Sequence, residues 1–163
     1  IQGILQTTLN FGPDDELVQS HPVIAAVQTL AEVTDPINYA PYWNSRTPFW
    51  STTPQSVLMT EGLQDLQTPP ATAEALAAAG RLPLIAPAAF VPTAHRLIGG
   101  GTTDAPVRRN KRAWSGERVT GGLAQYGSDD HFAVFNNEDA ASLYQTFLYT
   151  ALDGDTPWIQ ELR

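Results

Sequence analysis

The sequence contains no cysteine among its 163 residues, which excludes disulfide bonds and thiolate metal sites. It also lacks any apolar run of about 18 residues, so no transmembrane segment is predicted. Bases are few: 9 Lys and Arg stand against 17 Asp and Glu, which gives a net charge of −8. A chain this acidic is poorly suited to nucleic acid or an anionic membrane surface, because both are negatively charged.

Metal-binding and phosphate-binding patterns are absent as well. His21, His95 and His131 are too scattered to indicate a metal site, and no His-Glu-x-x-His spacing occurs. The glycine run 99–101 lacks the Lys-Ser/Thr that completes a phosphate-binding loop. We interpret His21 and His95 as structural or solvated residues, and no metal is predicted.

The most informative stretch reads as strand, acidic loop and helix. Val57 to Met59 is a short apolar run typical of a buried parallel strand, and Gly62 suits a sharp change of direction. Asp65 follows three residues later. Residues 71–79 then predict a helix, which Gly80 is placed to terminate. Functional groups of parallel sheets gather at the carboxyl ends of strands, which is where Asp65 stands.

A second stretch repeats this order with a histidine. Residues 118–126 predict a strand, His131 follows in a loop, and residues 138–152 predict a helix with Asn136 or Asn137 as its N-cap. An acid and then a histidine, each after a strand, are two members of a Ser-Asp-His triad.

Other interpretations of these residues stay open. Glu61, Asp104, Asp129 and Asp130 are competing acids, and Asp65 is favoured by its position alone. Asp65 can instead be an N-capping or loop acid. His131 can be a surface-loop histidine without a role.

Several motifs together resemble a known family. They are Gly62-x-x-Asp65, His131-Phe132 before the last helix, the segment Asp35-Pro36-Ile37-Asn38-Tyr39-Ala40-Pro41 and the strand from Val119 to Tyr126. The chain resembles the C-terminal part of an α/β-hydrolase, and is similar to large bacterial extracytoplasmic lipase/esterase-like proteins, the relatives of virulence-factor lipases. The resemblance runs from about His21 to the end.

The resemblance implies the C-terminal portion of an α/β fold, a mostly parallel sheet flanked by helices, present here as an incomplete fold. It implies catalytic roles for Asp65 and His131 in a serine carboxylic-ester hydrolase with an acyl-enzyme intermediate. It implies a small-molecule or lipid ester as substrate and no cofactor. It also suggests an extracytoplasmic location, secreted or in the cell envelope.

The nucleophile of such an enzyme is missing from this chain. No Gly-x-Ser-x-Gly occurs, and the family order of Ser, Asp, His places the serine before Ile1. The chain opens on Ile1 without a methionine, which suggests a fragment or a processed product. The partner would then be the N-terminal part of the same protein, pairing with an exposed sheet edge of this chain, which alone would be inactive.

We expect one domain, residues 1–163, with an insertion over residues 83–114 that accounts for the long stretch between Asp65 and His131. Pro83, Pro87 and Pro92 would confine any strand there to a sheet edge. The alternative function is a non-catalytic hydrolase-like module for binding or assembly, with the aromatic stretch from Tyr39 to Trp50 as its contact surface.

Overall fold

The computed structural model describes residue 7, residues 21–47 and residues 53–162. The chain divides into two compact units, Ile1–Asn38 and Tyr39–Arg163. Phe49 and Trp50, part of the aromatic stretch, lie outside the described residues.

The first unit contains one described helix of more than one turn, α2 (Pro22–Glu32). His21 is its N-cap, and its Nδ1 accepts a hydrogen bond from the Val23 N–H at 3.2 Å. Pro22 fits the first helical position, where no N–H is needed. A 3-10 turn, η1 (Pro36–Asn38), follows. The capping bond gives His21 a structural role.

The second unit is built on a four-stranded parallel sheet. Its strands are β1 (Val57–Gly62), β2 (Leu84–Ala86), β3 (Thr102–Asp104) and β7 (Gly121–Tyr126). Their order is β1-β7-β2-β3, and all three pairings are parallel. β1 therefore forms one edge of the sheet, and no other described strand pairs with its outer side.

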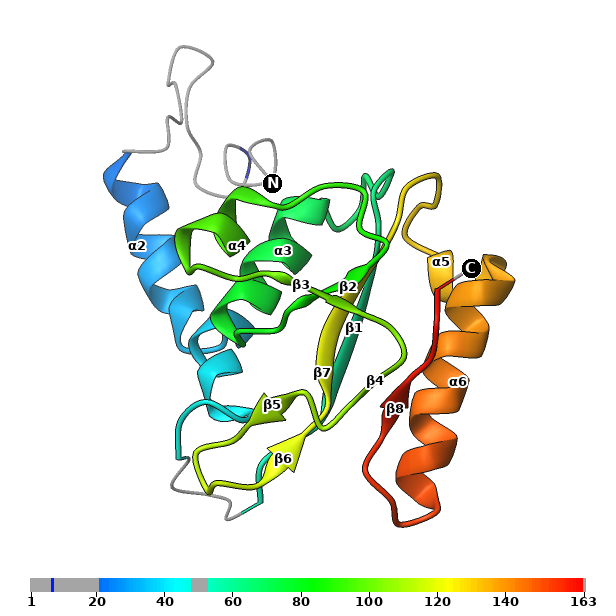
Figure 1. Cartoon of the computed structure of the whole chain (residues 1–163). Coiled ribbons are helices and arrows are strands. Elements are labelled where there is room, and N and C mark those ends of the chain that lie inside the picture. The colour runs from blue at the N-terminus through cyan, green and yellow to red at the C-terminus, as the bar shows by residue number, and fades with distance from the viewer. Residues whose placement is uncertain (1–6, 8–20, 48–52, 163) are drawn as a thin grey trace. The chain divides into compact units, whose positions relative to one another are not determined.

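Helices cover both faces of this sheet, so the unit is an α/β structure. Helix α3 (Pro70–Ala79) covers one face and α6 (Glu138–Leu152) the other, as Figure 1 shows. Successive strand residues point to opposite faces and enter different cores. The core beneath α6 consists of Ile85, Val107, Ala124, Tyr126, Ala140, Leu143, Phe147 and Ile159. The core beneath α3 consists of Ala77, Leu82, Leu84 and Leu123.

Shorter elements complete the unit. They are η2 (Ala40–Tyr42), α4 (Thr93–Leu97), β4 (Val107–Arg108), β5 (Lys111–Arg112), β6 (Arg118–Val119), α5 (Ala133–Asn136) and β8 (Trp158–Ile159). β4 pairs with β8, and β5 with β6, both antiparallel.

The ends of the two long helices follow local sequence signals. Asn137 caps α6, because its Oδ1 accepts hydrogen bonds from the N–H groups of Asp139 at 2.9 Å and Ala140 at 3.2 Å. Glu138 and Asp139 occupy the first turn, where the helix dipole favours acids. Gly80 terminates α3, and its N–H donates to the Leu76 carbonyl.

The position predicted for the proline-rich strand is wrong. β2 lies inside the sheet, between β7 and β3, rather than at an edge. The strand is only three residues long and starts after Pro83 and stops before Pro87, so neither proline occupies a donor position in the ladder. The Leu84 N–H donates to the Gly101 carbonyl at 3.0 Å. Prolines at both ends shorten this strand without excluding it from the interior.

Within the described part of the chain, no helix combines the length and apolar character needed to cross a bilayer.

Candidate active site

The acid loop and the histidine loop leave the sheet side by side. β1 and β7 are neighbouring parallel strands, and Gly62 pairs in register with Tyr126. Parallel strands end at the same edge of a sheet, so the loops that follow them meet there. Asp65 and His131 belong to these two loops.

The structure brings the two predicted site residues into direct contact. His131 Nδ1 and Asp65 Oδ2 are 2.9 Å apart, across a sequence separation of 66 residues. The Asp65 side chain is 11% exposed and that of His131 38%. The carboxylate is thus largely covered while the ring remains accessible.

Asp65 is anchored by its own loop. Its Oδ1 accepts hydrogen bonds from the N–H groups of Gln67 at 2.7 Å and Thr68 at 2.8 Å. Burial favours the neutral carboxyl, but the bonds from Thr68, His131 and Gln67 outweigh it and lower the pKa of Asp65. Oδ1 therefore accepts hydrogen bonds from the backbone of its own loop, as the capping interpretation predicts, and Oδ2 contacts His131.

The second ring nitrogen of His131 is left open. No described residue forms a hydrogen bond with Nε2, and no described serine or threonine hydroxyl bonds to the ring. The neighbouring Phe132 ring stands edge-on, with centroids 5.1 Å apart and planes at 89°. With Nδ1–H donated to Asp65, Nε2 carries the lone pair and can accept a proton from a ligand or a partner group.

The histidine loop is fixed against the end of β1. The Gln64 N–H donates to the Asp129 carbonyl at 2.9 Å, and its side-chain Nε2 donates to the Gly127 carbonyl at 3.1 Å. The competing acids in this loop are engaged elsewhere. Asp129 Oδ2 accepts from the Asn137 amide and Asp130 Oδ1 from the Phe132 N–H, each at 2.9 Å.

A cavity of about 200 Å³ adjoins the dyad. Its lining comes from the end of β1, the acid loop, α3, the histidine loop and α5: Thr60, Glu61, Gly62, Asp65, Thr68, Ala73, Asp130, His131, Ala133 and Val134. The dyad therefore lies beside a partly open cavity of mixed polar and apolar lining at the carboxyl edge of the sheet.

Glu61 is the residue whose importance sequence reasoning missed. It is 5% exposed, and its Oε1 accepts a hydrogen bond from Gln125 Nε2 at 2.9 Å. Its Oε2 is buried and has no partner among the described residues. Burial raises its pKa to about 7, the bond from Gln125 opposes this, and the Glu74 charge adds to it. In the sequence, the one indication of this burial is the alternation of side chains along β1. It places Glu61 on the same face of the sheet as Val57 and Met59, which pack under α3.

The remaining acids and histidines stay apart from the dyad. His95 is fully buried, with Nε2 3.0 Å from the Leu82 carbonyl oxygen, which makes it part of the core beneath α3. Asp104 ends β3, at the far edge of the sheet from β1. No group of three or more potential metal ligands occurs among the residues that the structure describes.

No protein-family model matches this chain, and no curated protein or solved structure is significantly similar to it.

Proposed function

We propose that this chain supplies the acid and the base of a serine carboxylic-ester hydrolase of the α/β-hydrolase type. The observation that carries the proposal is the contact of 2.9 Å between Asp65 Oδ2 and His131 Nδ1, in a histidine whose Nε2 has no described partner and whose side chain is among those lining a cavity. An anchored carboxylate on one nitrogen and a free second nitrogen are what a general base requires.

In this mechanism His131 Nε2 removes the proton from a serine hydroxyl as that oxygen attacks the ester carbonyl. The Asp65 carboxylate stabilises the imidazolium that forms, and His131 then gives the proton to the leaving alcohol. Water, deprotonated by the same nitrogen, attacks the acyl-enzyme, and the proton returns to the serine oxygen. No metal or organic cofactor takes part.

The nucleophilic serine would come from the N-terminal part of the same protein. Two features support this. No described hydroxyl bonds to His131, and β1, which leads into Asp65, is an edge strand whose outer side no described strand occupies. A further parallel strand added there would end at the same sheet edge as β1, and a serine following it would reach the dyad.

The test uses the longest natural polypeptide that contains this chain, assayed with p-nitrophenyl esters of acetate, butanoate and octanoate. We expect ester hydrolysis, and a loss in kcat of about 10⁶-fold for His131→Ala and about 10⁴-fold for Asp65→Asn. Asp104→Asn, which changes another acid after a strand, should keep full activity. Undiminished turnover by His131→Ala refutes the triad assignment.

A second candidate, a non-catalytic binding or assembly module, is favoured by one observation. Asp65 Oδ1 already has a structural role in its loop, so the carboxylate would be useful without any chemistry. A fluorophosphonate probe separates the two candidates, because it labels an activated serine. Labelling of the long polypeptide that disappears in His131→Ala supports the hydrolase, and a folded polypeptide that takes no label supports the module. The 163-residue chain alone is expected to be inactive in both cases.

A further inference from the structure

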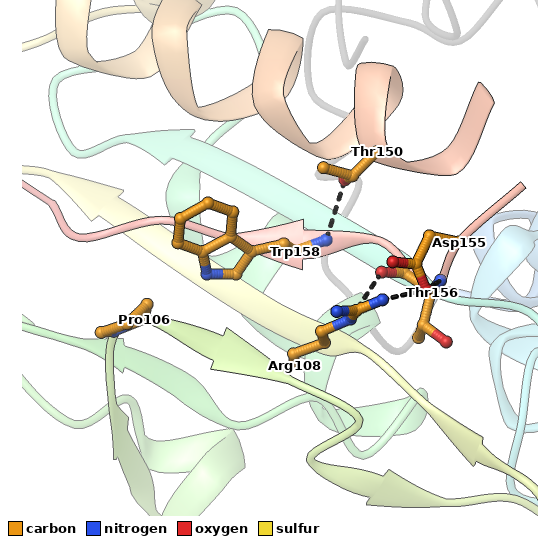
Figure 2. A pocket seen from close by; sticks show the side chains of 6 residues that line it. All are labelled: Pro106, Arg108, Thr150, Asp155, Thr156 and Trp158. Carbon is orange, nitrogen blue, oxygen red and sulfur yellow. Dashed lines mark hydrogen bonds and ion pairs between the residues drawn. The ribbon is translucent and has the colours of Figure 1, made fainter. Parts of the chain in front are cut away.

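A second and larger cavity lies away from the dyad. It has a volume of about 430 Å³ and is lined by Pro106, Arg108, Thr150, Asp155, Thr156 and Trp158, as Figure 2 shows. Asn137, the N-cap of α6, contacts the histidine loop, whereas Thr150 lies 13 residues farther along the helix. At about 1.5 Å per residue this places Thr150 about 20 Å along the helix from the end that contacts that loop. The cavity is therefore a separate site.

One wall of this cavity is apolar. Trp158 and Pro106 form it, from β8 and from the residue before β4 (Figure 2). Trp158 is 40% exposed, although the next residue, Ile159, is completely buried in the core. The Trp158 N–H donates to Thr150 Oγ1 at 3.1 Å, which fastens β8 to α6. The indole ring is thus held on a fixed backbone with part of its surface open to a ligand.

The other wall is polar. Its lining residues Arg108 and Asp155 carry opposite charges, and the neighbouring Arg109 Nε donates to Thr156 Oγ1 at 2.9 Å. Arg108 Nη2 forms an ion pair with Asp155 Oδ1, and Arg108 Nε donates to the Thr156 carbonyl at 3.1 Å. The Thr156 N–H also donates to Asp155 Oδ1, at 2.8 Å. All bonds to the carboxylate therefore use Oδ1. Asp155 Oδ2, Arg108 Nη1 and Trp158 Nε1 form no hydrogen bond with any described residue.

These groups select among ligand classes. An anion would meet the Asp155 carboxylate and a cation would meet the Arg108 guanidinium, so neither finds an unopposed charge among the residues that line the cavity. A purely apolar ligand would strip water from the ion pair without replacing its hydrogen bonds. A neutral ligand with one apolar face and several hydroxyls fits both walls, because each hydroxyl can donate to Oδ2 and accept from Nη1 or Nε1.

We propose that this cavity binds a saccharide ring, with the ring's C–H face on Trp158 and its hydroxyls on Asp155 and Arg108. The volume of about 430 Å³ falls within the range of small-molecule sites. The site is separate from the dyad, so it would hold a sugar-bearing ligand about 20 Å along α6 from the helix end that contacts the histidine loop.

The test observes the indole N–H signals of the tryptophans by ¹H–¹⁵N NMR, with the Trp158 signal assigned by its absence in Trp158→Phe. The probes are the methyl glycosides of glucose, galactose, mannose and N-acetylglucosamine, with benzoate as an anionic aromatic comparison. We expect at least one glycoside to shift the Trp158 signal in a saturable manner. No saturable shift with any of the four, or tighter binding of benzoate, overturns the proposal.

Matched variants distinguish a defined binding site from non-specific stacking of the sugar on Trp158. Asp155→Ala and Arg108→Gln should each weaken glycoside binding at least 10-fold. Asp153→Ala, in the same loop, and Arg112→Gln, in the same basic run, do not line the cavity and should bind normally. Trp158→Ala should abolish binding, and if that variant fails to fold, the Asp155 and Arg108 variants decide. Equal binding by all folded variants overturns the proposal.

Discussion

Gly62 and Asp130 approach so closely that a Cβ on Gly62 would lie 2.1 Å from the Asp130 carbonyl oxygen and 2.5 Å from that of Asp129. The end of the acid strand and the histidine loop are therefore in backbone contact, and only the absence of a side chain at position 62 allows it. This contact holds together the two segments that lead to Asp65 and His131.

Gly62→Ala should separate the two loops. The contacted atoms belong to the backbone, so the histidine loop must move, and we expect a loss of about 1–3 kcal/mol in the free energy of unfolding. Gly127→Ala is the matched control in the same loop, because a Cβ there meets no atom within 4 Å. Urea unfolding measures both variants. Equal stability of the two would show that the loop moves without cost.

Asp65→Ala should release the His131 ring. The hydrogen bond to Asp65 Oδ2 should slow the exchange of the His131 Nδ1–H and give it a downfield proton signal in NMR spectra. We expect this signal in the wild type and in Asp104→Asn, and its loss in Asp65→Ala. A signal that survives in Asp65→Ala would show that another group holds the ring.

Glu61 should make stability fall as the pH rises. Its pKa is about 7 in the folded state and 4.5 in its ordinary state, so the folded protein binds more protons between these values. The free energy of unfolding therefore decreases from pH 4.5 to 7, by at most about 3 kcal/mol. Glu61→Gln should remove this slope, whereas Glu117→Gln, which changes an exposed acid, should keep it. Urea titrations at several pH values measure the difference, and an unchanged slope in Glu61→Gln refutes the assignment.

Lys111 should stabilise the end of α3. Its Nζ donates to the Gly80 carbonyl at 3.1 Å and to the Arg81 carbonyl, two groups left without helical partners. Lys111→Met keeps an unbranched apolar side chain and removes the donor, which should cost about 1–3 kcal/mol. Arg112→Met, an exposed neighbour, should cost little. Thermal unfolding of the two variants makes the comparison, and similar midpoints would contradict this role.

The sequence predicts local elements well where local chemistry decides them. Residues 138–152 form a helix with Asn137 as its cap. An asparagine followed by two acids bonds the free N–H groups and favours the dipole at a helix start, and both effects are local. Asp65 and His131 were found in the same way, from strand ends that are visible in the apolar pattern. Their catalytic roles stay a prediction.

Features that depend on strand order could not be predicted. β7 lies between β1 and β2 although it follows both in the chain, and β2 is internal despite flanking prolines, because pairing is decided by burial between distant segments. The raised pKa of Glu61 also depends on contacts between segments that are distant in the sequence. Its raised pKa arises from burial and from Glu74, and its one partner, Gln125, is 64 residues away. No local pattern contains that information.

The pairing of β1 with β7 also affects the order of events in folding. These strands enclose the whole of α3, β2, α4 and β3 in one loop, and closing a long loop costs entropy that must be offset before the contact is stable. We expect the acid and histidine loops to meet only after that intervening segment is structured. Contact between Asp65 and His131 would then form late in folding. An incompletely folded chain would contain both residues, but they would not be paired and could not act as a general base.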